Sequence, residues 1–145
     1  MIKTTDQLSS QELLTILQAR TAVFVVEQNC PYQEVDEIDR EALHVCLMEN
    51  DMLQAYARIY ETGDGIHFGR VLVAKAFRGQ QLGRKLVTET MEAIEERFPQ
   101  RPVIISAQAH LTDFYQSFGF AACSEIYLED DIPHIDMRLE KATNH

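Results

Sequence analysis

The segment with the clearest capacity for chemistry runs from Val71 to Arg84, where an apolar stretch passes through a short loop directly into a helical pattern. The first turn of a helix presents unpaired N–H groups and a partial positive charge, and both favour an anion. Gly79 and Gly83 carry no Cβ, so the main chain there can approach a ligand closely. Arg78 and Arg84 would add charge-assisted hydrogen bonds to phosphate oxygens. These features indicate a site for a diphosphate.

This turn is not one of the common phosphate-binding loops. A Walker loop would end in Gly-Lys-Ser/Thr and a dinucleotide-binding fingerprint would read Gly-x-Gly-x-x-Gly, and neither pattern occurs here. The plainer alternative is a helix start whose glycine serves only packing against a sheet. Short glycine motifs arise by chance often enough to keep that alternative open.

A second segment with chemical potential follows, in which a strand-like run from residue 104 to 109 leads into a helical stretch around Tyr115. A phenol has a pKa of about 10 and is therefore protonated at neutral pH. It can donate its proton to a departing thiolate, whose conjugate acid has a pKa near 8.5. The alternative is a core tyrosine whose hydroxyl is satisfied by a neighbour.

Together the two segments resemble motifs A and B of the GNAT superfamily of N-acetyltransferases. Motif A has the pattern Arg/Gln-x-x-Gly-x-Gly/Ala, in which Arg78 and Gly83 match the outer positions and Gln81 replaces the central glycine. Motif B is a strand followed by a helix with an aromatic-Tyr pair and a terminal Gly-Phe, which match Phe114-Tyr115 and Gly119-Phe120. The likeness covers most of the chain. It narrows to the ElaA-like subgroup through residues 22–32, 68–71 and 132–135.

The resemblance implies that acetyl-CoA is the cofactor and coenzyme A the product. It implies a pantetheine arm lying between two splayed strands, with main-chain amides near Leu72 and Val73 polarising the acetyl carbonyl. Tyr115 would protonate the departing thiolate. The residues implied to bind the cofactor are Val71, Leu72, Val73, Arg78, Gly79, Gln80, Gln81, Leu82, Gly83, Arg84 and Phe114.

A primary amine that attacks the thioester must first lose a proton, and its pKa near 10 calls for a base. The candidates for that role, directly or through water, are Glu27, Asp36, His44 and His134. We assign Glu27 and His134 to catalysis and Asp36, His44 and Arg58 to the acceptor, whose carboxylate Arg58 could bind. Each has a plainer explanation: a solvated helix end for Glu27, a wetted loop for Asp36, a turn for His134, a satisfied sheet residue for His44 and an ion pair for Arg58.

Composition restricts the partners. The 145 residues include 13 Lys plus Arg and 23 Asp plus Glu, a formal net charge of −10 at pH 7. Without a basic run, nucleic acid is not expected as a partner, whereas a cationic amine, small or peptidic, would be attracted. No metal-ligand spacing is evident, and three widely spaced cysteines give no disulfide framework. No apolar run approaches the roughly 20 residues of a membrane span, so we expect a cytoplasmic protein, and edge strands would allow a homodimer.

Hydrophobic periodicity predicts the elements that must hold these residues. Residues 1–145 are expected to form a single α+β domain, a mixed and mostly antiparallel central sheet flanked by helices on both faces. Helices are predicted at 10–26, 82–98 and 113–118. Strands are predicted at 43–49, 53–60, 103–105, 120–128 and 135–139, and a further strand is predicted to end at residue 73.

The expected activity is therefore acetyl-CoA-dependent acetylation of a primary amine, which could belong to a small molecule, a peptide terminus or a lysine. A non-catalytic acyl-CoA-binding sensor module is the alternative.

Overall fold

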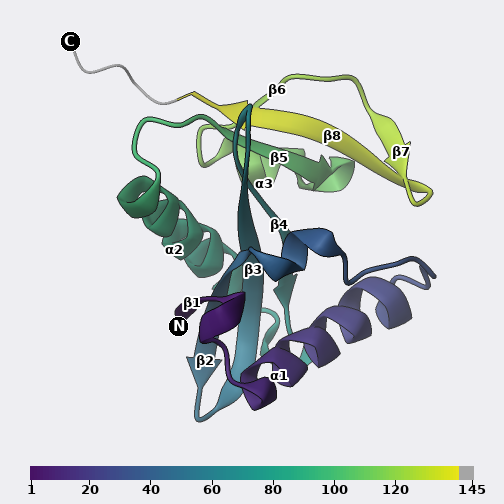
Figure 1. Ribbon diagram of the computed structural model, residues 1–145. Coiled ribbons are helices and arrows are strands. Elements are labelled where there is room, and N and C mark those ends of the chain that lie inside the picture. Colours follow the sequence, from purple (N-terminus) through teal and green to yellow (C-terminus); the bar gives the residue numbers. More distant parts are fainter. Residues whose placement is uncertain (141–145) are drawn as a thin grey trace.

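The computed structural model describes residues 1–140, whose strands form one sheet in the order β1-β2-β3-β4-β5-β8-β6, with β7 paired to β8 (Figure 1). All neighbouring strands are antiparallel except β4 and β5. The strands are β1 Ile2–Thr4, β2 Leu43–Glu49, β3 Met52–Thr62, β4 Gly65–Val73, β5 Val103–Gln108, β6 Ala121–Ala122, β7 Tyr127–Glu129 and β8 Ile132–Leu139. The helices are α1 Ser10–Arg20, α2 Leu82–Arg97 and α3 Thr112–Gln116.

The first helix begins at the capping box expected from the sequence. The Ser9 hydroxyl accepts from the Glu12 amide at 3.0 Å, and the Glu12 carboxylate accepts from the Ser9 amide at 2.8 Å, which satisfies two orphan donors. Helical structure continues beyond α1 as a π-helical segment, Thr21–Glu27. The predicted helix over 10–26 is thus confirmed in extent, with its last part wound more loosely than an α-helix.

Side chains on the two faces of the sheet alternate along each strand and meet different helices. Ala55, Ala57 and Ile59 of β3 lie in the larger core with the apolar face of α2. Tyr56, between them in sequence, lies in the smaller core under α1, with Ile16. Figure 1 shows α1 and α2 on opposite sides of β2 and β3. The expectation of helices on both faces is therefore confirmed.

The parallel strands β4 and β5 diverge, which opens the middle of the sheet. They pair only at Ile66 with Val103 and at His67 with Ile104. Beyond this point β4 runs on to Val73 without a partner from β5. The splayed strands expected from the family resemblance are therefore present.

A bulge lies in β4 beside this opening. Arg58 pairs with Gly69 and Tyr56 with Leu72, so two residues of β4 oppose Ala57. Arg70, in the bulge, has φ 51°, the left-handed region that side chains other than glycine seldom occupy.

The ends of the chain differ from the sequence-based prediction. The strand β1 was not expected, because three residues carry no readable periodicity. The predicted strand 120–128 is in fact two short strands, β6 and β7, both of which pair with β8. That partner begins at Ile132 rather than at 135 and includes Pro133. Within residues 1–140, no helix is long and apolar enough to cross a membrane, and no group of three or more His, Cys, Asp or Glu could hold a metal ion.

Candidate active site

The helix α2 begins with its first amides uncapped. Gln81 occupies the N-cap with φ 59° and ψ 26°, and its side chain makes no capping hydrogen bond. Three N–H groups of the first turn are thus left without an intrahelical acceptor. Gln81 adopts the left-handed conformation, which costs a residue other than glycine roughly 1–2 kcal/mol. The turn before α2 therefore takes a conformation that favours glycine although glutamine occupies this position.

The missing side chain of Gly83 is not explained by crowding inside the protein. A Cβ added there would lie 3.9 Å from the Val73 side chain and 4.0 Å from the Phe114 ring, which are ordinary van der Waals distances. The absence of a side chain instead leaves space between α2, β4 and α3. Gly79 has φ 84°, which favours glycine for its backbone conformation.

Arg78 and Arg84 are both held by neighbouring groups. Arg78 donates from Nε to the Val73 carbonyl oxygen at 3.0 Å and from Nη2 to the Glu27 carboxylate at 2.8 Å. Arg84 donates to the Ser117 hydroxyl at 2.9 Å, and its guanidinium lies 4.7 Å from the centre of the Phe118 ring. Arg78 thus joins the loop before α2 to β4, whereas Arg84 joins α2 to α3.

The amides at the end of β4 alternate between β3 and the opposite side of the strand. Ala74 N–H donates to the Gln54 carbonyl oxygen on β3 at 2.8 Å. Because successive peptide groups in a regular strand point to opposite sides, Leu72 N–H also faces β3, while the Val73 N–H faces away from it. Val71 belongs to the bulge, where this alternation is interrupted.

Tyr115 projects from α3 into the aromatic part of the larger core. Its side chain lies against Phe68, Phe114 and Phe120, with ring centroids 5.1–6.2 Å apart, and the residue is 5% exposed. Burial raises the pKa of its hydroxyl to about 12, so it is protonated at neutral pH. Within residues 1–140, the hydroxyl makes no hydrogen bond. Tyr115 is thus a core residue whose hydroxyl has no protein partner in this part of the chain, and its role in proton transfer stays a prediction.

The two residues assigned to proton transfer have ionic partners. Glu27, at the end of the π-helical segment, binds Arg78. His134 lies in β8, where its Nδ1 is 2.7 Å from the Ile132 carbonyl oxygen and its Nε2 is 3.4 Å from the Glu129 carboxylate. Neither contact removes the residue from consideration as a base, and both roles stay predictions.

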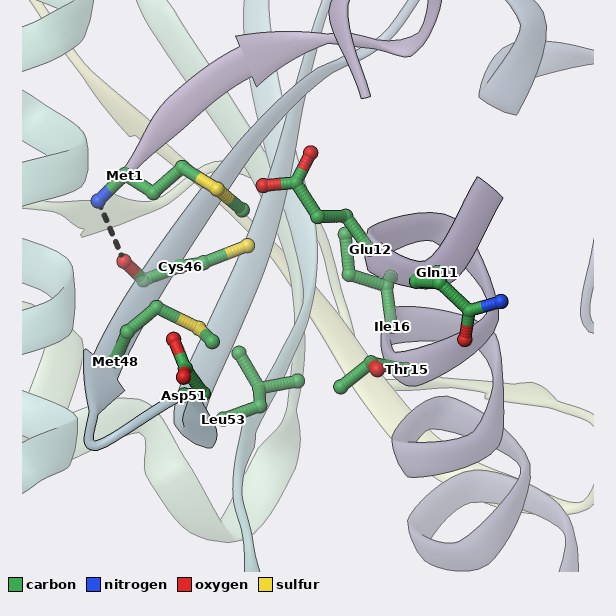
Figure 2. A pocket seen from close by; sticks show the side chains of 9 residues that line it. All are labelled: Met1, Gln11, Glu12, Thr15, Ile16, Cys46, Met48, Asp51 and Leu53. Carbon is green, nitrogen blue, oxygen red and sulfur yellow. Dashed lines mark hydrogen bonds between the residues drawn. The ribbon is translucent and has the colours of Figure 1, made fainter. Parts of the chain in front are cut away.

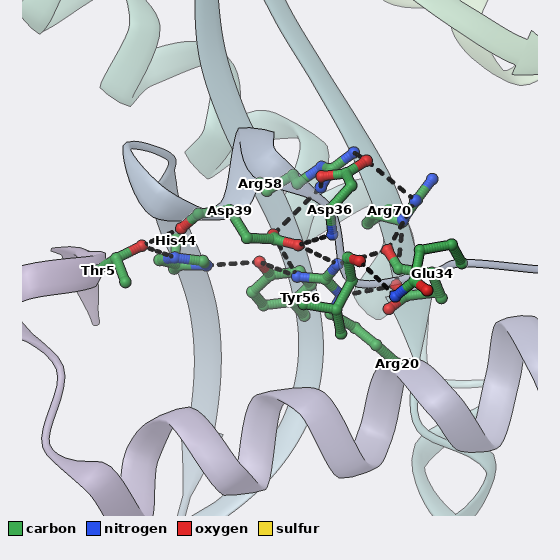
Figure 3. A network of polar contacts seen from close by, with 11 residues as sticks. Thr5, Arg20, Glu34, Asp36, Asp39, His44, Tyr56, Arg58 and Arg70 are labelled. Atoms are coloured by element: carbon green, nitrogen blue, oxygen red, sulfur yellow. Dashed lines mark hydrogen bonds and ion pairs between the residues drawn. The ribbon is translucent and has the colours of Figure 1, made fainter.

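The acceptor candidates Asp36 and Arg58 belong to a buried cluster of charges between α1 and the sheet (Figure 3). Arg20 donates to both carboxylate oxygens of Asp39, at 2.6 and 2.9 Å, and to Glu34 at 2.7 Å. Arg58 binds Asp36 at 2.7 Å and Asp39 at 3.1 Å. With Arg70, the cluster contains three arginines and three carboxylates, so its formal charge is zero. It fixes the segment 34–39 to the sheet.

His44 is a buried neutral member of the same region. Its Nδ1 lies 2.5 Å from the Tyr56 hydroxyl and its Nε2 lies 2.8 Å from the Thr5 hydroxyl. Burial lowers its pKa to about 4, so the ring is uncharged at neutral pH. The plainer explanation of His44, a satisfied residue within a strand, fits this placement better than contact with an acceptor.

A pocket of about 510 Å³ lies against the cluster on the α1 side. Asp36 and His44 both line it, whereas Arg58 does not line it and binds two lining residues, Asp36 and Asp39. Its lining is Thr5, Leu13, Leu17, Arg20, Gln33, Val35, Asp36, Glu37, Asp39, Arg40 and His44.

A smaller pocket, of about 240 Å³, lies between the start of α1 and the β2–β3 hairpin (Figure 2). Met1 lies across the sheet edge from Cys46, and the Met1 amino group donates to the Cys46 carbonyl oxygen at 2.9 Å. Neither pocket has a lining residue from α2, α3 or β5. Both are therefore separate from the opening beside Tyr115.

Sequence reasoning missed the residues that organise this region, chiefly Arg20, Glu34 and Arg70. One signal was available, because Arg20 follows Leu13, Ile16 and Leu17 at helical spacing and so falls on the apolar face of α1. A charged residue in that position predicts a buried ion pair. The acidic segment that follows supplies the partners.

The comparisons with known proteins show the family of the chain. The family model for the acetyltransferase (GNAT) domain matches residues 4–141, and the chain belongs to this family. Protein ElaA of Escherichia coli is 47% identical over 140 residues, covering 93% of this chain and 92% of that protein. The crystal structure of ElaA superposes with a TM-score of 0.92 at 46% identity, covering 97% of this chain and 98% of that one.

A second solved structure carries a functional description. The crystal structure of an acyl-CoA N-acyltransferase from Pseudomonas aeruginosa has a TM-score of 0.93 and is 44% identical, covering 96% of this chain and 97% of that one. The α+β fold with a mixed, mostly antiparallel sheet, expected from the sequence, is thereby confirmed.

Proposed function

We propose that the protein transfers an acetyl group from acetyl-CoA to a primary amine. The observation that carries this proposal is the opening of the sheet where β4 and β5 diverge, together with a Tyr115 hydroxyl that has no hydrogen-bond partner among residues 1–140. The Pseudomonas relative, described as an acyl-CoA N-acyltransferase, supports an acyl thioester as the donor.

The residues around the opening fit coenzyme A. The uncapped amides at the start of α2 suit the diphosphate, and Arg78 is close enough to the turn to add charge. Val71 and Val73 would bind the pantetheine arm through the main chain. An added Cβ at Gly83 would occupy space next to Val73 and Phe114, which is where that arm would pass.

When bound, acetyl-CoA would supply an activated acyl group with a thiolate leaving group. The protein's own contribution would be to donate a hydrogen bond from the Val71 N–H to the carbonyl oxygen, where negative charge develops as the amine attacks. Tyr115 would hold its proton at Oη and give it to the sulfur as the C–S bond breaks.

The amine must arrive neutral. We propose that Glu27 or His134 accepts its proton, directly or through water, and that the formal charge of −10 favours acceptors that are cationic in solution. Binding of a diphosphate near Arg78 would compete with Glu27 for the guanidinium and so free the carboxylate.

Calorimetry with acetyl-CoA, followed by thiol release in the presence of primary amines, tests this function. The amine panel should include amino acids, polyamines and peptides. We expect binding, and turnover with at least one member of the panel. Binding without turnover across the panel would favour the sensor module, and absence of binding would contradict both.

A further inference from the structure

Arg70 occupies a backbone conformation that its residue type disfavours. It has φ 51° within the β4 bulge, directly before Val71, and both residues oppose Ala57 of β3. A residue other than glycine persists in such a conformation only where the surrounding structure determines it. The contacts of the Arg70 side chain therefore determine whether the bulge is held in this conformation.

These contacts form a clamp from one segment of the chain. Arg70 donates from Nε to the Glu34 carboxylate at 3.0 Å and from Nη2 to the Glu34 carbonyl oxygen at 2.8 Å. Its guanidinium also stacks on the Tyr32 ring, 5.4 Å from the centroid. A third contact is the ion pair with Asp36 at 3.6 Å. The guanidinium is thus held by Glu34 and Asp36 through hydrogen bonds and ion pairs, and by the Tyr32 ring on one face.

The clamp is itself anchored in the interior of the protein. The Glu34 oxygen that accepts from Arg70 also accepts from Arg20 at 2.7 Å, and Arg20 is fully buried. The Glu34 carbonyl oxygen is likewise shared, since Arg20 donates to it at 3.2 Å. Figure 3 shows Glu34 between these two arginines. The bulge of β4 is therefore tied to α1 through one buried carboxylate.

We propose that Arg70 and Glu34 are positioning residues that hold the left-handed bulge and thereby aim the Val71 N–H at the acyl carbonyl oxygen. This inference rests on the proposed function only for the identity of the oxygen. Without the clamp, the backbone at residue 70 would relax toward an extended conformation and the amide would turn away. A direct contact between Arg70 and the acceptor is the competing explanation.

Two substitutions at the same residue separate these explanations. Arg70→Ala removes the clamp and keeps the conformational penalty, whereas Arg70→Gly removes the clamp and the penalty together. The test measures how far binding lowers the infrared carbonyl frequency of acetyl-CoA labelled with carbon-13 at the carbonyl. We expect a downshift in the wild type, its loss in Arg70→Ala and its recovery by at least half in Arg70→Gly, with acetyl-CoA affinities within threefold of one another.

Glu34→Gln provides an independent variant, because it keeps an acceptor oxygen but removes the charge. It should give a downshift between those of the wild type and Arg70→Ala. An undiminished downshift in Arg70→Ala would overturn the proposal. Equal loss in the Ala and Gly variants would also overturn it, since the side chain itself would then be what matters.

Hydrogen exchange tests the clamp without the cofactor. In the unliganded protein, the amide of Leu72, which faces β3, should exchange at least tenfold faster in Arg70→Ala than in the wild type, and Arg70→Gly should lie closer to the wild type. Unchanged exchange would contradict the clamp. If acetyl-CoA fails to bind the wild type, the proposed function fails, but this measurement still decides whether Arg70 holds the bulge.

Discussion

Arg20 and Asp39 form a two-point ion pair in which the guanidinium is fully buried and both carboxylate oxygens are engaged. Asp39 also accepts from Arg58, so one carboxylate serves two buried cations. Such an arrangement is expensive to break, because the remaining partner stays charged in a poorly solvated site. The cluster therefore ties the stability of the fold to single carboxylates.

Asp39→Ala should lower the free energy of unfolding by about 3–5 kcal/mol, since it removes one negative charge that Arg20 and Arg58 share and leaves the buried cluster with a net positive charge. Urea denaturation followed by circular dichroism measures this. The matched control is Glu37→Ala in the same segment, whose partner Arg40 is exposed, and its effect should stay within about 0.5 kcal/mol. Equal effects of the two substitutions would show that the buried cluster adds little.

Stability should fall in acid in two stages. Burial lowers the pKa of His44 from 6.5 to about 4, so the unfolded chain binds more protons, and stability present above pH 6.5 is lost as the pH falls toward 4. Burial opposes ionisation of Asp39, but the hydrogen bonds from Arg20 and from the Asp36 amide, together with the charges of Arg20 and Arg58, outweigh burial and lower this pKa from 3.8 to about 2, which extends the loss below pH 4.

The His44 contribution is at most roughly 3 kcal/mol between pH 6.5 and 4. Unfolding measured across this range should show a slope that is absent in His44→Gln. A variant that keeps the wild-type slope would mean that another group is responsible.

Tyr115→Phe should leave acetyl-CoA affinity and stability almost unchanged, because the hydroxyl has no hydrogen bond to lose. Turnover should fall by roughly 100- to 10,000-fold if the hydroxyl is the general acid. The contrasting substitution is Tyr127→Phe, whose hydroxyl binds Asp136 at 2.6 Å and should instead cost about 1 kcal/mol of stability. Full turnover by Tyr115→Phe would assign the proton to another donor.

Gly83→Ala should separate stability from cofactor binding. Alanine in the first turn of α2 favours the helix by about 0.5–1 kcal/mol over glycine, and its Cβ meets no close contact in the protein. The same Cβ would obstruct the cofactor, so the affinity for acetyl-CoA should fall by at least about tenfold, or roughly 1.4 kcal/mol. Thermal unfolding and calorimetry measure the two effects. Gly63→Ala, in open space, should leave affinity unchanged.

Glu27→Gln should reduce turnover while acetyl-CoA binds at least as tightly as before, because Arg78 loses an anionic competitor of the diphosphate. Thiol release and calorimetry give the two quantities. Unreduced turnover would leave His134 as the candidate base.

Local patterns predicted most of the fold. The helix over 82–98 and the strand over 43–49 were readable because their apolar residues recur at 3.6 or two residues, and the observed elements end within a residue of those bounds. The turn at Asn50-Asp51 was readable as well, and both residues have positive φ, as in the turns that close two-residue hairpins.

Features that depend on distant contacts were not readable. The strand β1 exists because Ile2 pairs with Val45, far along the chain. The left-handed conformation of Arg70 has no local signal, since arginine does not favour it, and the contacts with Glu34 that accompany it cross 36 residues. The motif predicted the position of Tyr115, but the lack of a partner for its hydroxyl emerges only once the surrounding rings are in place.

The two register pairs between β4 and β5 also set how the halves of the sheet are joined. A pantetheine arm in the opening would contact both halves along most of their length. It would take the place of the β4–β5 strand pairing that ends at His67 and Ile104. The ligand would then contribute to the contact between the two halves, and its binding should raise the unfolding temperature by an amount set by its affinity and concentration. Each release of product would remove this contact between the two halves of the sheet.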